Sequence, residues 1–145
     1  MRWLARRIAA SRDDDEGSVL ILTLGYAVLA LAAVFVCVDA TSLYLAQTRL
    51  DGLADAAALA GADGFTLEVV AGEPRAELTT GAVHDQADAL VAEVGGGAVL
   101  VDARTPDGVS ARVTVARTWH PAVFSFFVPD GVAIEATATS RTALR

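Results

Sequence analysis

Residues 19–38 read VLILTLGYAVLALAAVFVCV and contain no charged side chain. Because a helix rises about 1.5 Å per residue, a helix of this length is about as long as the core of a bilayer is thick. Twelve of these residues are Leu, Ile, Val or Phe, and on a scale that applies near the helix centre they favour insertion by about 4 to 7 kcal/mol. The sequence therefore predicts a membrane span here, with membrane lipid as its first partner.

The apolar run continues into an amphipathic segment without a proline or a turn cluster. Apolar side chains recur in this segment at alternating steps of three and four residues, at Leu43, Ala46, Leu50, Leu53, Ala57 and Ala60. Such spacing is typical of one face of a helix. We predict one helix over residues 18–62, about 70 Å long, whose second half projects from the membrane and uses this stripe for helix packing.

The projecting half has two further patterns. Gln47, Asp51 and Asp55 share a face at steps of four residues. This face is a cation site, a contact for an arginine of a neighbouring subunit, or, as we prefer, a solvated surface. Four alanines lie four or eight residues apart, at Ala46, Ala54, Ala58 and Ala62. Small residues at this spacing permit close approach of helices, which would suit pilin-like bundling.

Three pieces of this region carry a resemblance. Gly17-Ser18-Val19 opens the apolar run, DATSLYLAQTRL follows at 39–50, and LADAAALAGADGF follows at 53–65. Together they resemble the Flp pilus-assembly TadE/G-like proteins. Asp39, Tyr44 and Asp55 are the family-like positions, and ADAAALAGA at 54–62 is the most specific piece. The resemblance implies a single-pass membrane protein of a Tad (tight adherence) pilus system, with a pilin-like N-terminal helix and a structural, non-enzymatic role.

The resemblance also points to a processing site at Gly17 and Ser18. Pilin precursors have a short basic leader that ends in Gly, and their peptidase cuts after it. In this chain the leader ends in four acidic residues, and Leu22 would be the fifth residue after the cut. Pilins typically have Glu there, whose charge is tolerated in lipid because it pairs with the terminal amine of an adjoining subunit. Leu22 cannot form this pair. We therefore expect an uncleaved anchor or, after cleavage, a filament cap.

The charge distribution predicts the orientation. The net charge is −7, yet the segment before Gly17 is balanced, with Arg2, Arg6, Arg7 and Arg12 against Asp13, Asp14, Asp15 and Glu16. Because basic residues near a span favour the cytoplasmic side, we expect a cytoplasmic leader-like segment over 1–17 and an extracytoplasmic domain over 63–145. An acidic outer domain argues against nucleic acid as a partner, because phosphates call for a basic surface.

A cleaved secretory signal is the main alternative for this segment. The apolar region of such a signal runs about 7 to 15 residues and ends at a small-residue cleavage site. The run in this chain is longer, and Val38-Asp39-Ala40 is a poor cleavage site. We therefore favour retention in the cytoplasmic membrane as a single-pass protein.

Residues 63–145 predict a small α+β domain. Residues 65–78 suggest a short strand or a small hairpin. Thr79 or Thr80 then caps a helix that ends at Gly95-Gly96-Gly97. Its expected apolar face consists of Val83, Ala87, Leu90, Val91 and Val94.

Two Pro-Asp-Gly turns organise the rest of the chain, at 106–108 and 129–131. They predict antiparallel strands over 98–104, 109–119 and 132–142, with a short helix before the second turn. On the middle strand, odd-numbered residues from Val109 to Val115 should face inward and Ser110 outward. The predicted fold class is α+β: a long transmembrane pilin-like helix followed by a small antiparallel sheet with one covering helix. A ferredoxin-like layer is one arrangement that this order of elements would fit.

The sequence contains no recognisable catalytic constellation. His84 and His120 have no partners at metal-ligand spacing, although His84 with Asp85 and Asp88 is a weak candidate for a cation site. We therefore expect no enzyme activity, no cofactor and no small-molecule substrate. Aromatic residues cluster around Pro121, at Trp119, Phe124, Phe126 and Phe127. They form either a docking patch or, as we prefer, a lid over the core.

These patterns favour a membrane-anchored accessory subunit of a Tad/Flp-type pilus assembly or secretion system. The resemblance implies other pilin-like subunits and the inner-membrane Tad platform proteins as its partners. The alternative is a single-pass, membrane-anchored extracytoplasmic binding or sensor module unrelated to pili.

Overall fold

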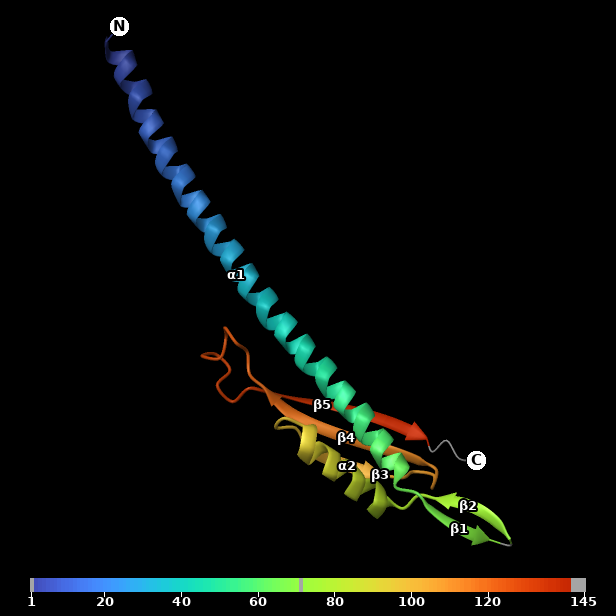
Figure 1. The fold of residues 1–145 in the computed structure, drawn as a ribbon. Helices are drawn as coiled ribbons and strands as arrows, with labels where there is room; N and C mark the ends of the chain where they lie inside the picture. Colours follow the sequence, from blue (N-terminus) through green and yellow to red (C-terminus); the bar gives the residue numbers. More distant parts are fainter. Residues whose placement is uncertain (1, 71, 142–145) are drawn as a thin grey trace. The chain divides into compact units, whose positions relative to one another are not determined.

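A computed structural model describes the backbone of residues 2–70 and 72–141; the side chains of 2–16, 69, 70 and 73–76 lie outside the description. The elements in chain order are α1 (Arg2–Asp63), β1 (Thr66–Val70), β2 (Glu73–Glu77), α2 (Thr80–Val94), β3 (Val99–Arg104), β4 (Ser110–Trp119) and β5 (Val132–Arg141) (Figure 1). A long helix followed by antiparallel strands and one further helix confirms the predicted α+β class.

The chain divides into two compact units, Met1–Ala40 and Thr41–Arg145. The first unit is helical along its described length. The second unit contains the last part of α1, both sheets and α2. The helix from Thr41 onward is thus grouped with the folded domain, and the expected bounds of the helix (18–62) and of the domain (63–145) stay a prediction. Most of the predicted leader, 1–17, has side chains outside the description.

Strands β3, β4 and β5 form an antiparallel sheet in that order, while β1 and β2 form a separate hairpin. In the larger sheet Val113 pairs with Ala103 on one side and with Ala138 on the other. A bulge between Leu100 and Asp102 shifts the β3 register. The ferredoxin-like layer is wrong, because β1 does not join this sheet and the residues between β4 and β5 form turns instead of a short helix.

The core lies on one face of the three-stranded sheet. The alternation of the strands places Ala111, Val113 and Val115 on this face, and all three are fully buried. The other buried apolar residues come from both helices, the residue before α2 and the sheet. They are Leu50, Ala54, Ala57, Ala58 and Ala62 of α1, Leu78 before α2, Val83, Ala87 and Val91 of α2, and Ala103, Ile134, Ala136 and Ala138 of the sheet. Two helical segments, α2 and the last part of α1, therefore contribute to the core on this face. The prediction had one covering helix, with the last part of α1 projecting separately.

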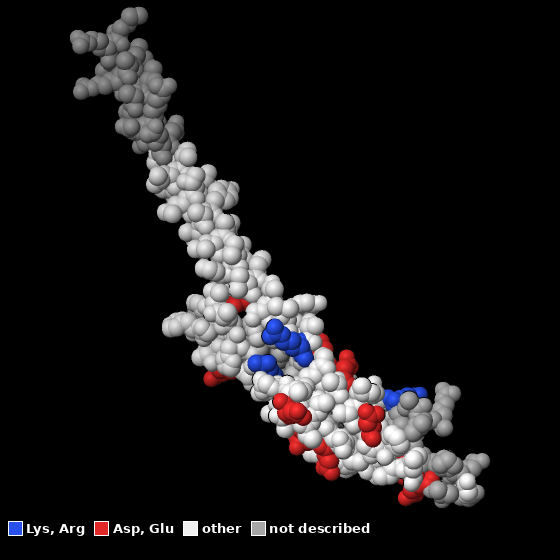
Figure 2. Space-filling view, viewed as in Figure 1, with Lys and Arg blue, Asp and Glu red and all other residues white. Residues whose placement is uncertain are grey.

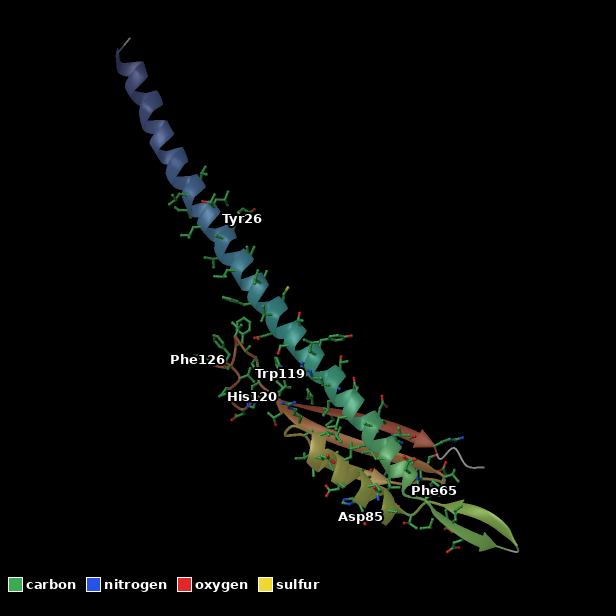
Figure 3. The ribbon with its side chains drawn as sticks, viewed as in Figure 1. Tyr26, Phe65, Asp85, Trp119, His120 and Phe126 are labelled. Atoms are coloured by element: carbon green, nitrogen blue, oxygen red, sulfur yellow. The ribbon has the colours of Figure 1, made fainter. Side chains whose placement is uncertain are left out.

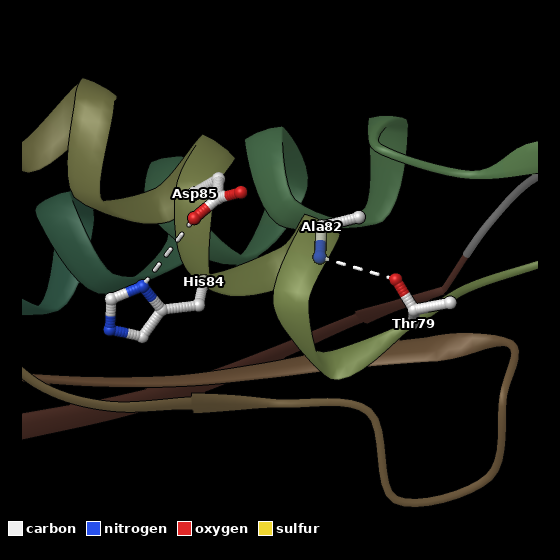
Figure 4. A network of polar contacts seen from close by, with 4 residues as sticks. All are labelled: Thr79, Ala82, His84 and Asp85. Carbon is white, nitrogen blue, oxygen red and sulfur yellow. Dashed lines mark hydrogen bonds and ion pairs between the residues drawn. The ribbon is translucent and has the colours of Figure 1, made fainter.

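Helix α2 begins and ends close to the prediction. The Thr79 side chain accepts a hydrogen bond from the Ala82 amide at 3.2 Å, which caps the first turn (Figure 4). The helix ends at Val94, before Gly95. Val83, Ala87 and Val91 are buried, but Val94 is exposed. Its predicted place on the apolar face is wrong because it lies in the last turn of the helix, where the core ends.

The first Pro-Asp-Gly turn determines the start of β4. One carboxylate oxygen of Asp107 accepts hydrogen bonds from the Val109 and Ser110 amides at 3.1 and 2.7 Å, and the other accepts one from the Ser110 hydroxyl at 2.8 Å. These bonds leave Ser110 only 2% exposed, whereas Val109 is 45% exposed. The predicted orientation of these two residues is therefore wrong, because the turn, and not the strand, determines where they point.

Candidate functional site

The first unit presents an uncovered apolar surface. Every described residue from Gly17 to Val38 is exposed, and no charged side chain interrupts this part of α1 (Figure 2). Among the residues that the structure describes, 17–63 is the one helix long and apolar enough to cross a membrane. An apolar surface of this length with no protein cover suggests a membrane anchor.

The predicted packing stripe lies against the chain's own domain. Leu50 and Ala57 are buried in the core, Leu43, Ala46 and Leu53 pack against it, and Ala60 is half-buried. Ala54, Ala58 and Ala62 are each only 1% exposed. These three alanines are covered by other residues of the same unit. They are therefore not available for the bundling with other subunits that their spacing had suggested.

A close approach between helices explains why small residues gather here. A Cβ atom at Gly61 would lie 3.0 Å from Cγ1 of Val83 in α2 and 3.4 Å from Cβ of Ala111 in β4. Gly61 therefore lies where α1, α2 and the sheet meet. The small residues of ADAAALAGA at 54–62 allow this contact. Their spacing along one helix did not indicate that they pack against α2 and β4 of the same chain.

Two side-chain hydrogen bonds connect α1 to the sheet. Trp119 Nε1 donates to Ser42 Oγ at 3.2 Å, and Gln47 Nε2 donates to the Glu135 carbonyl at 3.0 Å. Gln47 Nε2 also donates to Asp51 Oδ1 at 3.1 Å. The predicted polar face is therefore divided: Gln47 belongs to the contact with β5, while Asp51 is exposed. The partners of Ser42 and Gln47 could not be predicted from the sequence, because each lies in a distant strand.

The family-like and processing positions lie in different surroundings. Asp39 is only 6% exposed, whereas Tyr44 is 69% exposed and Asp55 is exposed. Gly17 and Ser18 are exposed on α1. A side chain at residue 17 would meet no other atom within 4 Å, so this position is sterically open.

The aromatic cluster after β4 divides into buried and exposed members. Trp119 packs against the core, but Phe126 is 89% exposed and Phe127 is 77% exposed. Their rings stack edge to face at 5.7 Å between centroids. The expected core lid is therefore wrong for both residues. The reason is that the segment between β4 and β5 forms turns of its own, with Phe127 N donating to Phe124 O at 2.9 Å, beyond the end of the sheet (Figure 3).

The polar residues His84, Asp85 and Asp88 lie on the exposed surface of α2. His84 Nδ1 lies 4.0 Å from Asp85 Oδ1, and both side chains are largely exposed (Figure 4). The described part of the chain has no group of three or more His, Cys, Asp or Glu side chains that could hold a metal ion. The His84–Asp85 pair is therefore a solvated pair on the helix surface.

Comparison with known proteins identifies the N-terminal region. Residues 17–64, a third of the chain, match the family described as "Putative Flp pilus-assembly TadE/G-like". The comparisons with curated proteins and with solved structures found no match. The matched residues contain the uncovered apolar helix, the alanine-rich packing segment and Gly61, and they end one residue after α1. Residues 17–64 are therefore similar to the TadE/G-like proteins of Flp pilus assembly.

Proposed function

We propose that this protein is a membrane-anchored, pilin-like accessory subunit of a Tad/Flp-type pilus assembly or secretion system. The observation that carries the proposal is the coincidence of the TadE/G-like match with a helix whose residues 19–38 are uncharged and exposed. The proposed role is structural: the first unit holds the protein in the membrane, and the second presents a small folded domain outside it.

The division of α1 restricts where partner helices can bind. From Leu50 to Ala62 its small apolar face is occupied by the chain's own core, while residues 18–38 are exposed. Packing against other pilin-like subunits or against inner-membrane platform proteins is therefore assigned to the part of the helix within the membrane. Close packing in that environment relies on van der Waals contact and small residues, and a Cβ atom at Gly25 would meet nothing within 4 Å outside the backbone of its own helix.

Co-purification from detergent-solubilised membranes tests this function. We expect Tad platform proteins or pilin-like subunits to co-purify with the intact protein. A matched variant, Gly25→Leu, should stay in the membrane but recover less of these partners, because a large side chain would obstruct close approach between helices. If the intact protein purifies from a Tad-expressing cell without any Tad component, it is instead a free-standing binding or sensor module.

A further inference from the structure

The loop between β4 and β5 presents two aromatic side chains to its surroundings. Phe126 and Phe127 are the most exposed large apolar residues in the described part of the chain, at 89% and 77%. Residues 122–128 include no charged side chain. Soluble surfaces rarely present adjacent aromatic rings in this way, and such patches usually mark an interaction site. The question is which partner can reach this loop.

Chain connectivity places the base of the loop near the membrane. Trp119, the last residue of β4, donates its hydrogen bond to Ser42 of α1 at 3.2 Å. Ser42 is four residues beyond Val38, where the uncharged run ends. Four residues span at most about 15 Å even when fully extended. The loop therefore begins close to the end of the proposed membrane span, whatever angle the chain takes between its two units.

The loop is held in a defined shape at this position. Phe127 and Val128 both donate to the Phe124 carbonyl, and Gly131 donates to the Val128 carbonyl. Gly131 has φ +70°, and a Cβ atom there would lie 2.7 Å from the Trp119 carbonyl oxygen. The loop thus returns to β5 through a position that only glycine fits. The backbone that carries the two aromatic rings is therefore held in a defined turn.

A third exposed aromatic residue, Tyr44, lies in the same part of the unit. Tyr44 follows Ser42 by two residues on α1 and is 69% exposed. Aromatic side chains are enriched at the boundary between membrane and water, where an apolar ring and polar neighbours are both accommodated. Figure 3 shows Phe126 beyond Trp119 and His120, at the end of the unit opposite Phe65. Tyr44 on α1 and the Phe126–Phe127 pair in the loop therefore both lie near the point where the proposed span ends.

We propose that Phe126 and Phe127 insert into the interfacial layer of the bilayer and give the protein a second membrane contact beside its helix. This inference rests on the membrane anchoring proposed above. Insertion is limited to the interfacial layer, because the hydrocarbon core does not accept irregular backbone exposed to lipid. The contact depends on apolar burial and not on charge, so phosphatidylcholine alone should support it.

Site-specific fluorescence of the full-length chain tests the proposal. The native cysteine is removed by Cys37→Ala, and Ser125→Cys, beside the two Phe residues, carries an environment-sensitive NBD label. In phosphatidylcholine vesicles we expect a blue-shifted emission that nitroxide-labelled phosphatidylcholine quenches strongly. Adding Phe126→Ser and Phe127→Ser should abolish most of this quenching. The same label at Thr139→Cys, on the exposed face of β5, should remain unquenched.

A label at native Cys37 separates the two proposals. Cys37 lies in the apolar run and is exposed, so its label should be quenched whenever the helix is in the membrane. Quenching at Cys37 with a water-like, unquenched spectrum at residue 125 would overturn the loop contact alone and leave a protein partner as the occupant of the loop. Unquenched labels at both positions would overturn the membrane anchor as well.

Discussion

Gly61 of α1 and Val83 of α2 lie so close together that a Cβ atom at residue 61 would approach Cγ1 of Val83 to 3.0 Å. Val83 is itself completely buried. Val83 therefore has little room to move away from a larger side chain at residue 61.

Gly61→Val should destabilise the second unit by about 1 to 3 kcal/mol, because overpacking forces neighbouring side chains out of their preferred positions. Gly52→Val is the matched control, since a Cβ atom at residue 52 meets nothing within 4 Å. Urea unfolding of the detergent-solubilised protein, followed by circular dichroism, measures both. Equal midpoints for the two variants would contradict this packing.

Substitution of the buried helix face should reduce stability far more than substitution of the exposed face. Leu50 is 3% exposed and Ala57 is fully buried, whereas Asp51 is exposed. Leu50→Asp or Ala57→Asp would bury an unpaired carboxylate, which costs several kcal/mol. Asp51→Ala removes one solvated hydrogen bond and should cost little. Membrane levels of the three variants, measured by immunoblot, should differ accordingly; similar levels for all three would count against the assignment.

Asp107 should make stability depend on pH in the acid range. Its pKa is lowered, first by the hydrogen bond from the Ser110 hydroxyl and then by that from the Val109 amide. The unfolded chain therefore binds more protons than the folded protein below the usual pKa of about 3.9. The contribution of Asp107 is complete above that value and is lost as the pH falls through the lower, folded-state pKa.

The Asp107→Asn variant isolates this effect. We expect its urea midpoint to lie below that of the wild type at about pH 7, and the difference to shrink progressively as the pH falls below about 3.9. Asp102→Asn is a suitable control, since that side chain forms a surface ion pair with Arg104 at 3.4 Å and such pairs contribute little. If the difference in urea midpoint between the wild type and Asp107→Asn stays constant with pH, the Asp107 carboxylate does not titrate as described.

The mature N-terminus should include the residues before Ser18. Leu22 occupies the position where a pilin would have Glu, and it is 61% exposed on the apolar helix. Intact mass spectrometry of membrane-extracted protein should therefore show an uncleaved chain, with Gly17→Leu changing the mass only by the substitution itself. Chains that begin at Ser18 would refute the uncleaved form, and abundant chains in sheared pili would also refute a cap.

The second unit should lie outside the cytoplasmic membrane. A reporter enzyme that is active only outside the cytoplasm should be active when fused after Arg145, because the arginines before Gly17 favour the cytoplasmic side. Replacing Arg2, Arg6, Arg7 and Arg12 by Gln should lower this activity and raise that of a cytoplasm-specific reporter. Activity of only the cytoplasmic reporter in the wild type would reverse the orientation.

Local patterns in the sequence predicted most of the elements but not what covers them. The capping residue Thr79 and the turn residues Asp107 and Gly108 act within a few positions, so their roles could be inferred directly from the sequence. The alanines of residues 54–62 are different, because a stripe of small residues indicates close packing without indicating the partner. Only the fold shows that α2 and the sheet occupy this stripe.

The aromatic loop was mispredicted for a similar reason. A cluster of Phe residues is more often buried than exposed, and the predicted end of the strand at Trp119 does not indicate whether the segment after it folds back over the core. Val94 and Val109 were misplaced at the ends of regular elements, where alternation and helical periodicity no longer determine which side chain faces the core.

Among the residues that the structure describes, five of the sixteen in the buried core belong to α1. Proteolysis between Ala62 and Thr66 would therefore not release an intact domain, since the sheet would lose the helix that covers it. Any soluble form must be severed before Thr41. During synthesis the same helix leaves the ribosome first, so the strands made later can condense on a helix that already exists.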